Sequence, residues 1–271
     1  MSQPDHVPDT GVDAIGADPS ETPAQAQADE ELGRTVAALT ADDLEPAGRR
    51  RLLGRLVGDV RRRGIGQVFK PRSALRWMAD VVADVAPHVP VRDIETLRRH
   101  FPGLDGEALA ERLIRNAARA TAGVGAAGGG IAAVEWAAAP TLLSAPVLLS
   151  AETIAVVTIE MKLIGELHEV YGQPVSGSGT ERALALVQSW AGQRGVNPLV
   201  PGVGVASVLG TAARKELQKS LLRRFGRNLT TMGPMLTGAA VASYLNRRAT
   251  RGVGEKVCAD LKKSGRRALP G

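Results

Sequence analysis

The pattern with the clearest chemical meaning is Gly123-Val-Gly125-Ala-Ala-Gly128, which matches the G-x-G-x-x-G signature of dinucleotide-binding loops. In such a loop the glycines permit a tight turn after a strand and let a phosphate approach a helix N-terminus. Here the preceding residues, ERLIRNAARATA, predict a charged amphipathic helix instead of a buried strand. We therefore predict no nucleotide cofactor. Gly125 and Gly129 also form a G-x-x-x-G pair, which favours close packing of two helices, and we expect them to face the next helix, which begins near Ser144. The predicted helix-packing residues are Gly123, Gly125, Gly128 and Gly129.

Residue types that serve catalysis or bind metals are scattered. The histidines are His6, His88, His100 and His168. The Glu166-x-His168 spacing does not place both side chains on one helix face, as a metal pair would need. Cys258 is a single cysteine, which excludes an internal disulfide and is interpreted as a small core residue. No phosphate-binding G-x-x-x-x-G-K-[ST] and no G-x-S-x-G nucleophile motif occurs. The sequence predicts no catalytic residues, no metal and no cofactor, and it favours a non-enzymatic protein.

Two carboxylates lie in apolar surroundings, Glu135 and Glu152, within a stretch from 120 to 159 that has no other charge. Burial would raise their pKa values, or each could pair with an arginine. The simpler interpretation is a carboxylate at a helix end or facing a partner, because structural groups also show such shifts.

A basic cluster lies earlier in the chain, between residues 49 and 76, which contain ten bases and one acid, Asp59. They are Arg49, Arg50, Arg51, Arg55, Arg61, Arg62, Arg63, Lys70, Arg72 and Arg76. One interpretation is an ordinary solvated helix face. The other is contact with an anionic surface, where each base near a lipid surface contributes on the order of 1 kcal/mol.

Charge is divided unevenly along the chain. Residues 1–45 hold eleven acids and one base, a net charge of −10, whereas the remainder holds 33 bases and 17 acids, a net charge of +16. Residues 1–28 lack apolar periodicity and predict a disordered acidic arm. The start of the chain also lacks the basic and apolar regions of a secretory signal, so we expect a cytoplasmic protein that is not secreted.

A basic body raises the possibility of nucleic-acid binding. Clustered bases give affinity for phosphate, but base stacking would require exposed aromatic side chains, and only 3% of the residues are aromatic. Trp77, Trp136 and Trp190 lie in predicted helices and are interpreted as core residues. A nucleic-acid or protein partner therefore remains the alternative to an anionic membrane surface.

Helical periodicity begins near Asp29 and continues through most of the chain. Leu52, Leu53, Leu56, Val57 and Val60 recur at the spacing of one helical face. Further helices are predicted over 72–85, 91–101 and 105–119, the last running into the Gly-rich stretch, and from about 144 to 171. In the second half of that last helix, Glu160, Lys162, Glu166 and Glu169 are expected to face water, opposite an apolar stripe. Residues 172–180 read as a linker.

Two further uncharged runs, 195–213 and 228–246, come close to the roughly 20 residues that a membrane span requires. Both contain Pro, Gly, Asn or Thr, so a soluble bundle, a shallow hairpin and true spans all remain open, with a slight preference for shallow or peripheral association.

The predicted fold is an all-α multi-helix bundle with a central Ala/Gly-rich helical hairpin and a disordered acidic N-terminal arm. The expected regions are the arm over 1–28, a basic amphipathic helical region over 29–104, an Ala/Gly-rich helical core over 105–265 and a tail over 266–271.

Three segments, ATAGVGAAGGGIAAVEWAAAP, IGELHEVYG and GPMLTGAAVASYLNRRATRGVGEKV, occur in an order that resembles the EcsC-type bacterial proteins, over roughly residues 108–261. The most recognisable positions are Gly238, Asn246, Arg247, Arg248, Thr250 and Gly254. The resemblance implies an α-helical, membrane-associated bacterial protein and brings no catalytic residues. Together with the basic cluster, it leads us to expect docking on an anionic membrane.

Overall fold

The computed structural model describes residues 23–68, 81–82, 84–138, 145–177, 179–194 and 234–268. Within these ranges the chain is helical and contains no strand, so the all-α prediction is confirmed. The elements are α1 (Pro23–Leu39), α2 (Pro46–Val68), η1 (Ala86–His88), α4 (Ile94–His100), α5 (Gly106–Ala138), α6 (Ala145–Val170), α7 (Gly179–Gln193) and α10 (Pro234–Ala268).

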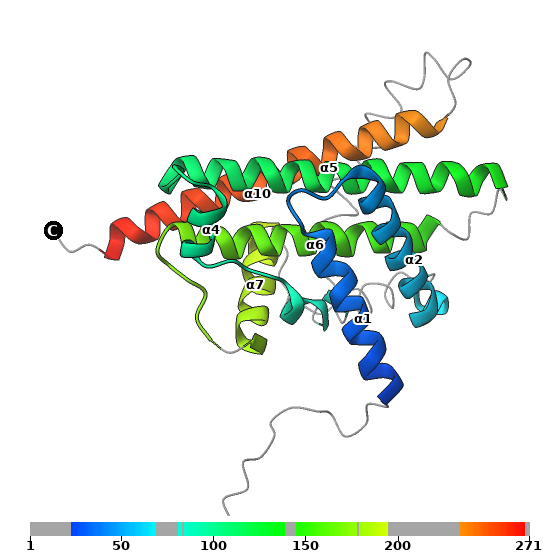
Figure 1. The fold of residues 1–271 in the computed structure, drawn as a ribbon, viewed down its shortest axis with the longest axis horizontal. Helices are drawn as coiled ribbons and strands as arrows, with labels where there is room; N and C mark the ends of the chain where they lie inside the picture. Colours follow the sequence, from blue (N-terminus) through cyan, green and yellow to red (C-terminus); the bar gives the residue numbers. More distant parts are fainter. Residues whose placement is uncertain are drawn as a thin grey trace, which may run out of the picture.

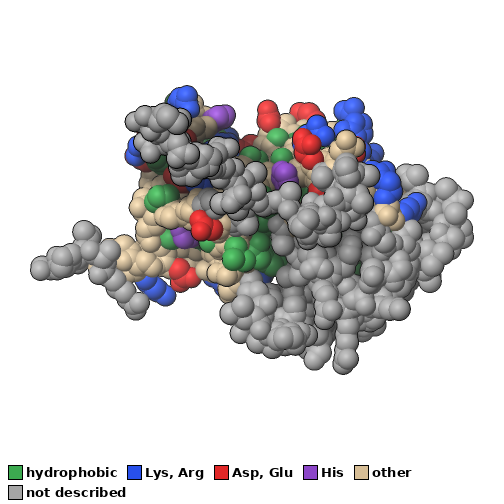
Figure 2. All heavy atoms as spheres, turned by 90° about the horizontal axis from the view of Figure 1, so that it is seen from below, with side chains coloured by type: hydrophobic (Ala, Val, Ile, Leu, Met, Phe, Trp, Pro, Cys, Tyr) green, Lys and Arg blue, Asp and Glu red, His purple; other side chains and the backbone are tan. Residues whose placement is uncertain are grey.

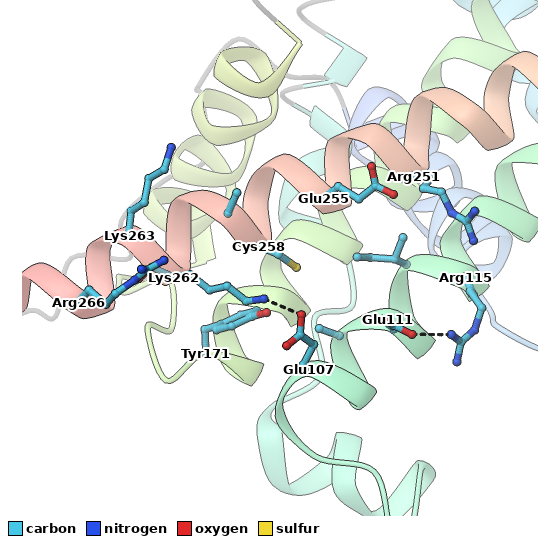
Figure 3. A pocket seen from close by; sticks show the side chains of 13 residues that line it. Glu107, Glu111, Arg115, Tyr171, Arg251, Glu255, Cys258, Lys262, Lys263 and Arg266 are labelled. Atoms are coloured by element: carbon cyan, nitrogen blue, oxygen red, sulfur yellow. Dashed lines mark hydrogen bonds and ion pairs between the residues drawn. The ribbon is translucent and has the colours of Figure 1, made fainter.

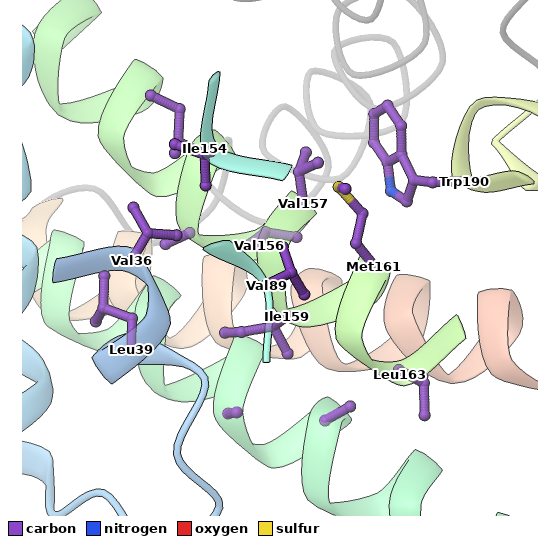
Figure 4. Packing of buried hydrophobic residues seen from close by; sticks show 14 of the residues in the cluster. Val36, Leu39, Val89, Ile154, Val156, Val157, Ile159, Met161, Leu163 and Trp190 are labelled. Carbon is purple, nitrogen blue, oxygen red and sulfur yellow. The ribbon is translucent and has the colours of Figure 1, made fainter. Parts of the chain in front are cut away.

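Helix α6 is the central element, because α1, α2, α4, α5, α7 and α10 all contact it (Figure 1). It supplies much of the hydrophobic core, including Ile154, Val157, Met161 and Leu163 (Figure 4). Trp190 of α7 is also fully buried, as predicted for a core tryptophan. Residues 154–167 of α6 are all buried as a result, so a charged side chain in this part needs a partner within the protein.

Helices α5 and α10 form the most extensive helix pair, and they run antiparallel (Figure 1). Glu107 contacts Lys262, Ile114 lies at Gly254, Gly125 at Ala242 and Gly129 at Ala239. Each step forward on α5 is therefore matched by a step backward on α10. The pairing extends over roughly 33 Å, at about 1.5 Å per helical residue.

Glycines allow this pair to approach closely. A Cβ atom on Gly125 would lie 2.8 Å from the Ala242 carbonyl carbon, and one on Gly129 would lie 2.6 Å from the Ala239 Cα. Both glycines were expected to face the following helix, α6, but their neighbour is α10. Gly128 is the glycine that faces α6, where a Cβ would overlap the Glu152 carboxylate, and Gly123 faces Arg49 of α2.

One hydrophobic cluster extends through the described helices. It includes Leu32 and Val36 of α1, Leu53 of α2, Leu113 of α5 and Val257 of α10. Residues on both sides of position 104 contribute to this cluster, since α1 packs on α6 and α2 packs on both α5 and α6.

Several element ends differ from the sequence pattern. Helix α1 begins at Pro23, earlier than the expected start near Asp29, and residues 1–22 lie outside the described residues. Helix α4 begins after Asp93, whose carboxylate accepts a hydrogen bond of 2.7 Å from the Thr96 backbone N–H. Helix α10 continues to Ala268, so the expected tail begins within a helix. The uncharged run 195–213, residues 228–233 and the turn near Ser144 lie outside the described residues.

Two glycine substitutions test the close approach of α5 and α10, because they should change the free energy of unfolding in opposite directions. Gly129→Ala should lower the free energy of unfolding by about 1 to 3 kcal/mol, because the new methyl group overlaps the α10 backbone. Gly252→Ala, in α10, adds a methyl group with no neighbour within 4 Å and should raise it by about 0.5 to 1 kcal/mol through helix propensity. Chemical denaturation of both variants measures the difference; stabilisation by both would contradict the packed seam.

Candidate functional site

The basic cluster of the sequence occupies one side of α2. Taking about 100° per residue, Arg50, Arg51, Arg55, Arg61 and Arg62 fall within an arc of about 140°, and all five are exposed. The opposite side carries Leu53, Leu56, Val57 and Val60, which are buried against the bundle. Figure 2 shows Lys and Arg side chains gathered along its upper right edge, which corresponds to the position of α2. We call these five exposed arginines the α2 basic face.

Arg49 does not belong to this face, which corrects the sequence prediction. It is only 5% exposed, and its guanidinium donates a hydrogen bond of 3.0 Å to the Leu39 carbonyl oxygen. Burial lowers the pKa of the Arg49 guanidinium. The helical phase explains the difference, because Arg49 lies four residues before Leu53 and so on the apolar stripe. Arg49 links the end of α1 to α2 and packs on Gly123 of α5.

The remaining members of the predicted cluster are placed as follows. Arg62 forms an ion pair with Asp59 one turn earlier and stays largely exposed. Arg63 lies within α2, but its side chain is outside the described residues, as are Lys70, Arg72 and Arg76 altogether.

A buried carboxylate that the sequence did not indicate lies at the centre of the bundle. Glu160 of α6 is 0% exposed and accepts hydrogen bonds from Trp190 Nε1 at 2.8 Å, from Arg194 and from the Thr250 hydroxyl at 2.8 Å. The Thr250 and Thr121 hydroxyls lie 3.0 Å apart, which connects α5 to the same group. One carboxylate thus joins α5, α6, α10 and the end of α7.

A second ionic group links α6 to the loops that precede α2 and α4. Arg92 donates two hydrogen bonds to Glu166, at 2.7 and 3.0 Å, and lies 2.8 Å from Asp42. Lys162 lies 3.2 Å from Glu166 and 3.7 Å from Asp42. Two cations and two carboxylates therefore balance one another in a mostly buried position.

The prediction that Glu160, Lys162 and Glu166 face water is wrong, since all three are buried. Their spacing looked like the polar side of an amphipathic helix. Because other helices cover that side of α6, each charge needs a partner within the protein. The sequence does contain bases that could pair with these carboxylates, such as Arg92 and Arg194. No periodic pattern could assign the pairs, because the partners are far apart in the chain.

The residues that carry the resemblance to the EcsC-type family lie in α10. Some contact neighbouring helices, and others are exposed. Asn246 donates a hydrogen bond of 3.2 Å to the Thr121 carbonyl oxygen, Thr250 joins the Glu160 group, and Gly254 lets Ile114 approach. Arg247 and Arg248 are exposed, with Arg248 3.4 Å from the Tyr244 hydroxyl. Gly238 lies within the first turns of the same helix.

Glu152 is a partly buried carboxylate that packs on the backbone of α5 at Gly128. Burial raises its pKa from 4.5 to about 7. Of the two possibilities considered for Glu152, a pKa raised by burial is therefore the one that the structure supports. The side chain of Glu135 is outside the described residues.

A groove of about 500 Å³ lies along the seam between the first part of α5 and the last part of α10 (Figure 3). Its lining includes the buried Ala110 and Ile114, the half-buried Tyr171 and Cys258, and charged side chains from both helices. Burial, and then the neighbouring Cys258 thiol, raises the pKa of Tyr171 to about 12. Burial also raises the pKa of Cys258, which favours its neutral thiol.

Among the described residues, no three His, Cys, Asp or Glu side chains come together in a way that would hold a metal ion. None of the helices in the described ranges combines the length and the apolarity that crossing a bilayer requires. Comparisons with protein families, with curated proteins and with solved structures gave no match to this chain.

Removing the charge of Glu160 should destabilise the whole bundle. We expect Glu160→Gln to lower the free energy of unfolding by about 3 to 5 kcal/mol, because the Arg194 guanidinium loses the carboxylate that balances its buried charge. Glu111→Gln, a control that breaks the exposed pair with Arg115, should cost no more than about 1 kcal/mol. Equal effects in the two variants, measured by denaturation, would refute the central role of Glu160.

The buried Glu152 predicts a specific pH dependence of stability. Its folded-state pKa of about 7 exceeds the ordinary 4.5, so the folded protein keeps a proton that the unfolded chain loses between these values. The free energy of unfolding should therefore fall as the pH rises from about 4.5 to 7, and this contribution should stay constant above.

Glu152→Gln removes the titrating group and should flatten that part of the profile. At pH 8 the variant should be more stable than the parent by up to about 3 kcal/mol, whereas at pH 4 the two should nearly coincide. Urea denaturation across this range measures both values. A constant difference at every pH would contradict a buried, proton-holding Glu152.

Proposed function

We propose that this protein is a non-enzymatic, EcsC-like helical protein that docks peripherally on an anionic membrane surface through the α2 basic face. The observation that supports this most directly is the separation of the two sides of α2. Its apolar side is held by the core, while Arg50, Arg51, Arg55, Arg61 and Arg62 lie on the exposed side. Because the core already holds this helix, its backbone does not have to become ordered when the arginines meet a surface.

The expected binding free energy favours a reversible association with the membrane. Each base near an anionic lipid surface contributes about 1 kcal/mol, so five arginines supply several kcal/mol, which salt reduces by screening. Arg62 is partly neutralised by Asp59, which lowers its share. The affinity should thus depend strongly on ionic strength and on the fraction of anionic lipid.

The test compares vesicles of neutral phosphatidylcholine with vesicles containing phosphatidylglycerol, using the full chain at low and high salt. We expect binding to the anionic vesicles alone, weaker at high salt. Arg51→Gln with Arg55→Gln should weaken binding roughly thirtyfold, from about 1 kcal/mol for each lost charge. Both side chains are exposed, so their replacement should leave the fold intact.

A matched control removes two charges elsewhere. Arg247→Gln with Lys263→Gln changes two exposed bases of α10 and should reduce vesicle binding much less, although the net charge is the same. Equal losses in both double variants would refute a role for α2. Binding of duplex DNA, with no vesicle binding, would replace this proposal with the nucleic-acid alternative.

A further inference from the structure

The groove between α5 and α10 is separate from the α2 basic face. Helix α2 packs on α5 at Gly123 and Gly130, whereas the groove uses Glu107 to Arg115 of α5 and Arg251 to Arg266 of α10. Its volume of about 500 Å³ lies within the range of small-molecule sites. The groove and the α2 basic face can therefore be tested independently of each other.

Charged side chains lie at both ends of the groove. The Lys262 ammonium lies 2.7 Å from the Glu107 carboxylate, which ties the two helices together at one end. At the other end, Arg115 of α5 and Arg251 of α10 come from nearly opposite positions of the antiparallel pair, since Ile114 lies at Gly254. Figure 3 shows Arg251 extending from α10 toward the side of α5 that carries Arg115.

The two arginines differ in what they already contact. Arg115 forms an ion pair with Glu111, at 3.0 Å. Arg251 is exposed and has no hydrogen bond or ion pair with any part of the chain that the structure describes. The groove lining as a whole carries five bases and three acids, so it retains an excess of positive charge.

The floor between the two ends is apolar. Ala110 and Ile114 are buried there, and in Figure 3 the Cys258 sulfur points into the space between the helices. The Tyr171 hydroxyl is buried and lies beside the Cys258 thiol. The middle of the groove therefore offers a ligand an apolar surface, between the Lys262–Glu107 pair at one end and the two arginines at the other.

We propose that the groove binds a small organic anion whose carboxylate or phosphate lies between Arg115 and Arg251. The apolar body of the ligand lies on Ile114 and Cys258 and points toward Tyr171. A guanidinium presents two parallel N–H donors that match a carboxylate or phosphate, and Arg251 has these donors available. The apolar body replaces water over the floor, which adds affinity that an inorganic anion does not gain.

Calorimetric titration of the full chain with four probes tests the proposal. Octanoate and octyl phosphate carry both the anion and the apolar chain, octanol lacks the anion, and inorganic phosphate lacks the chain. We expect the first two to bind at one site and the last two to bind at least about tenfold more weakly. The tighter of the two anionic probes identifies carboxylate or phosphate as the preferred group.

Variants locate the site. Arg251→Gln should weaken octanoate binding about tenfold, and Arg251→Lys should recover only part of this loss because an ammonium lacks the planar fork. Arg247→Gln, one turn away on α10 and outside the groove lining, should leave binding unchanged. Ala259→Leu adds bulk at an exposed lining position and should weaken both anionic probes.

Equal affinities for octanoate and octanol, or octanoate binding that Arg251→Gln leaves unaltered, would overturn the proposal. So would inorganic phosphate binding as tightly as octyl phosphate, because the apolar floor would then contribute nothing. The Arg51→Gln and Arg55→Gln variant provides the separation from membrane docking. It should bind octanoate normally even where its vesicle binding is lost.

Discussion

The carboxylate of Glu160 is the constraint on which the bundle depends. An ionised group without solvent contact is tolerated only where several donors surround it, since desolvation alone costs several kcal/mol. Here the donors come from the indole of Trp190, the guanidinium of Arg194 and the hydroxyl of Thr250. An arrangement of α6, α7 and α10 that separates these groups would leave the buried carboxylate without its donors, at a large cost in free energy. The carboxylate thus selects one packing among the many that apolar contacts alone would permit.

Close approach of α5 and α10 is the second constraint, and it determines the surface as well as the core. Small residues at Gly125, Gly129 and Gly254 allow the two helices to pack with little space between them. The antiparallel register then fixes which charged residues face one another across the seam. Glu107 meets Lys262, and Arg115 lies near Arg251, so the charge pattern of the groove follows from the position of the glycines.

Arginines of one short segment have different roles because of helical phase. Arg49 lies on the side of α2 that the core covers, and its guanidinium satisfies the carbonyl at the end of α1. Arg51 and Arg55 lie on the other side and stay exposed. Residue type and local charge density are the same for all three, so only the angular position about the helix axis separates a structural arginine from one available to a ligand.

The sequence by itself determined that the protein is helical and, for helices such as α2, which side is buried. The run from Leu53 to Val60 predicted the buried side of α2, and the pattern from Asp105 onward predicted the long helix through the glycines. These features depend on residues three or four apart, which one helix brings together whatever surrounds it.

Tertiary structure decided which neighbour covers each face. The sequence pattern assigned Gly125 and Gly129 to the next helix in the chain, whereas α10, more than a hundred residues later, packs against them. It also placed Glu160 and Glu166 toward water, because a periodic pattern separates polar from apolar sides only when one side of the helix is solvated. Helix α6 is covered by neighbours on several sides, so its charged residues found partners at Arg194 and Arg92 that are distant in sequence.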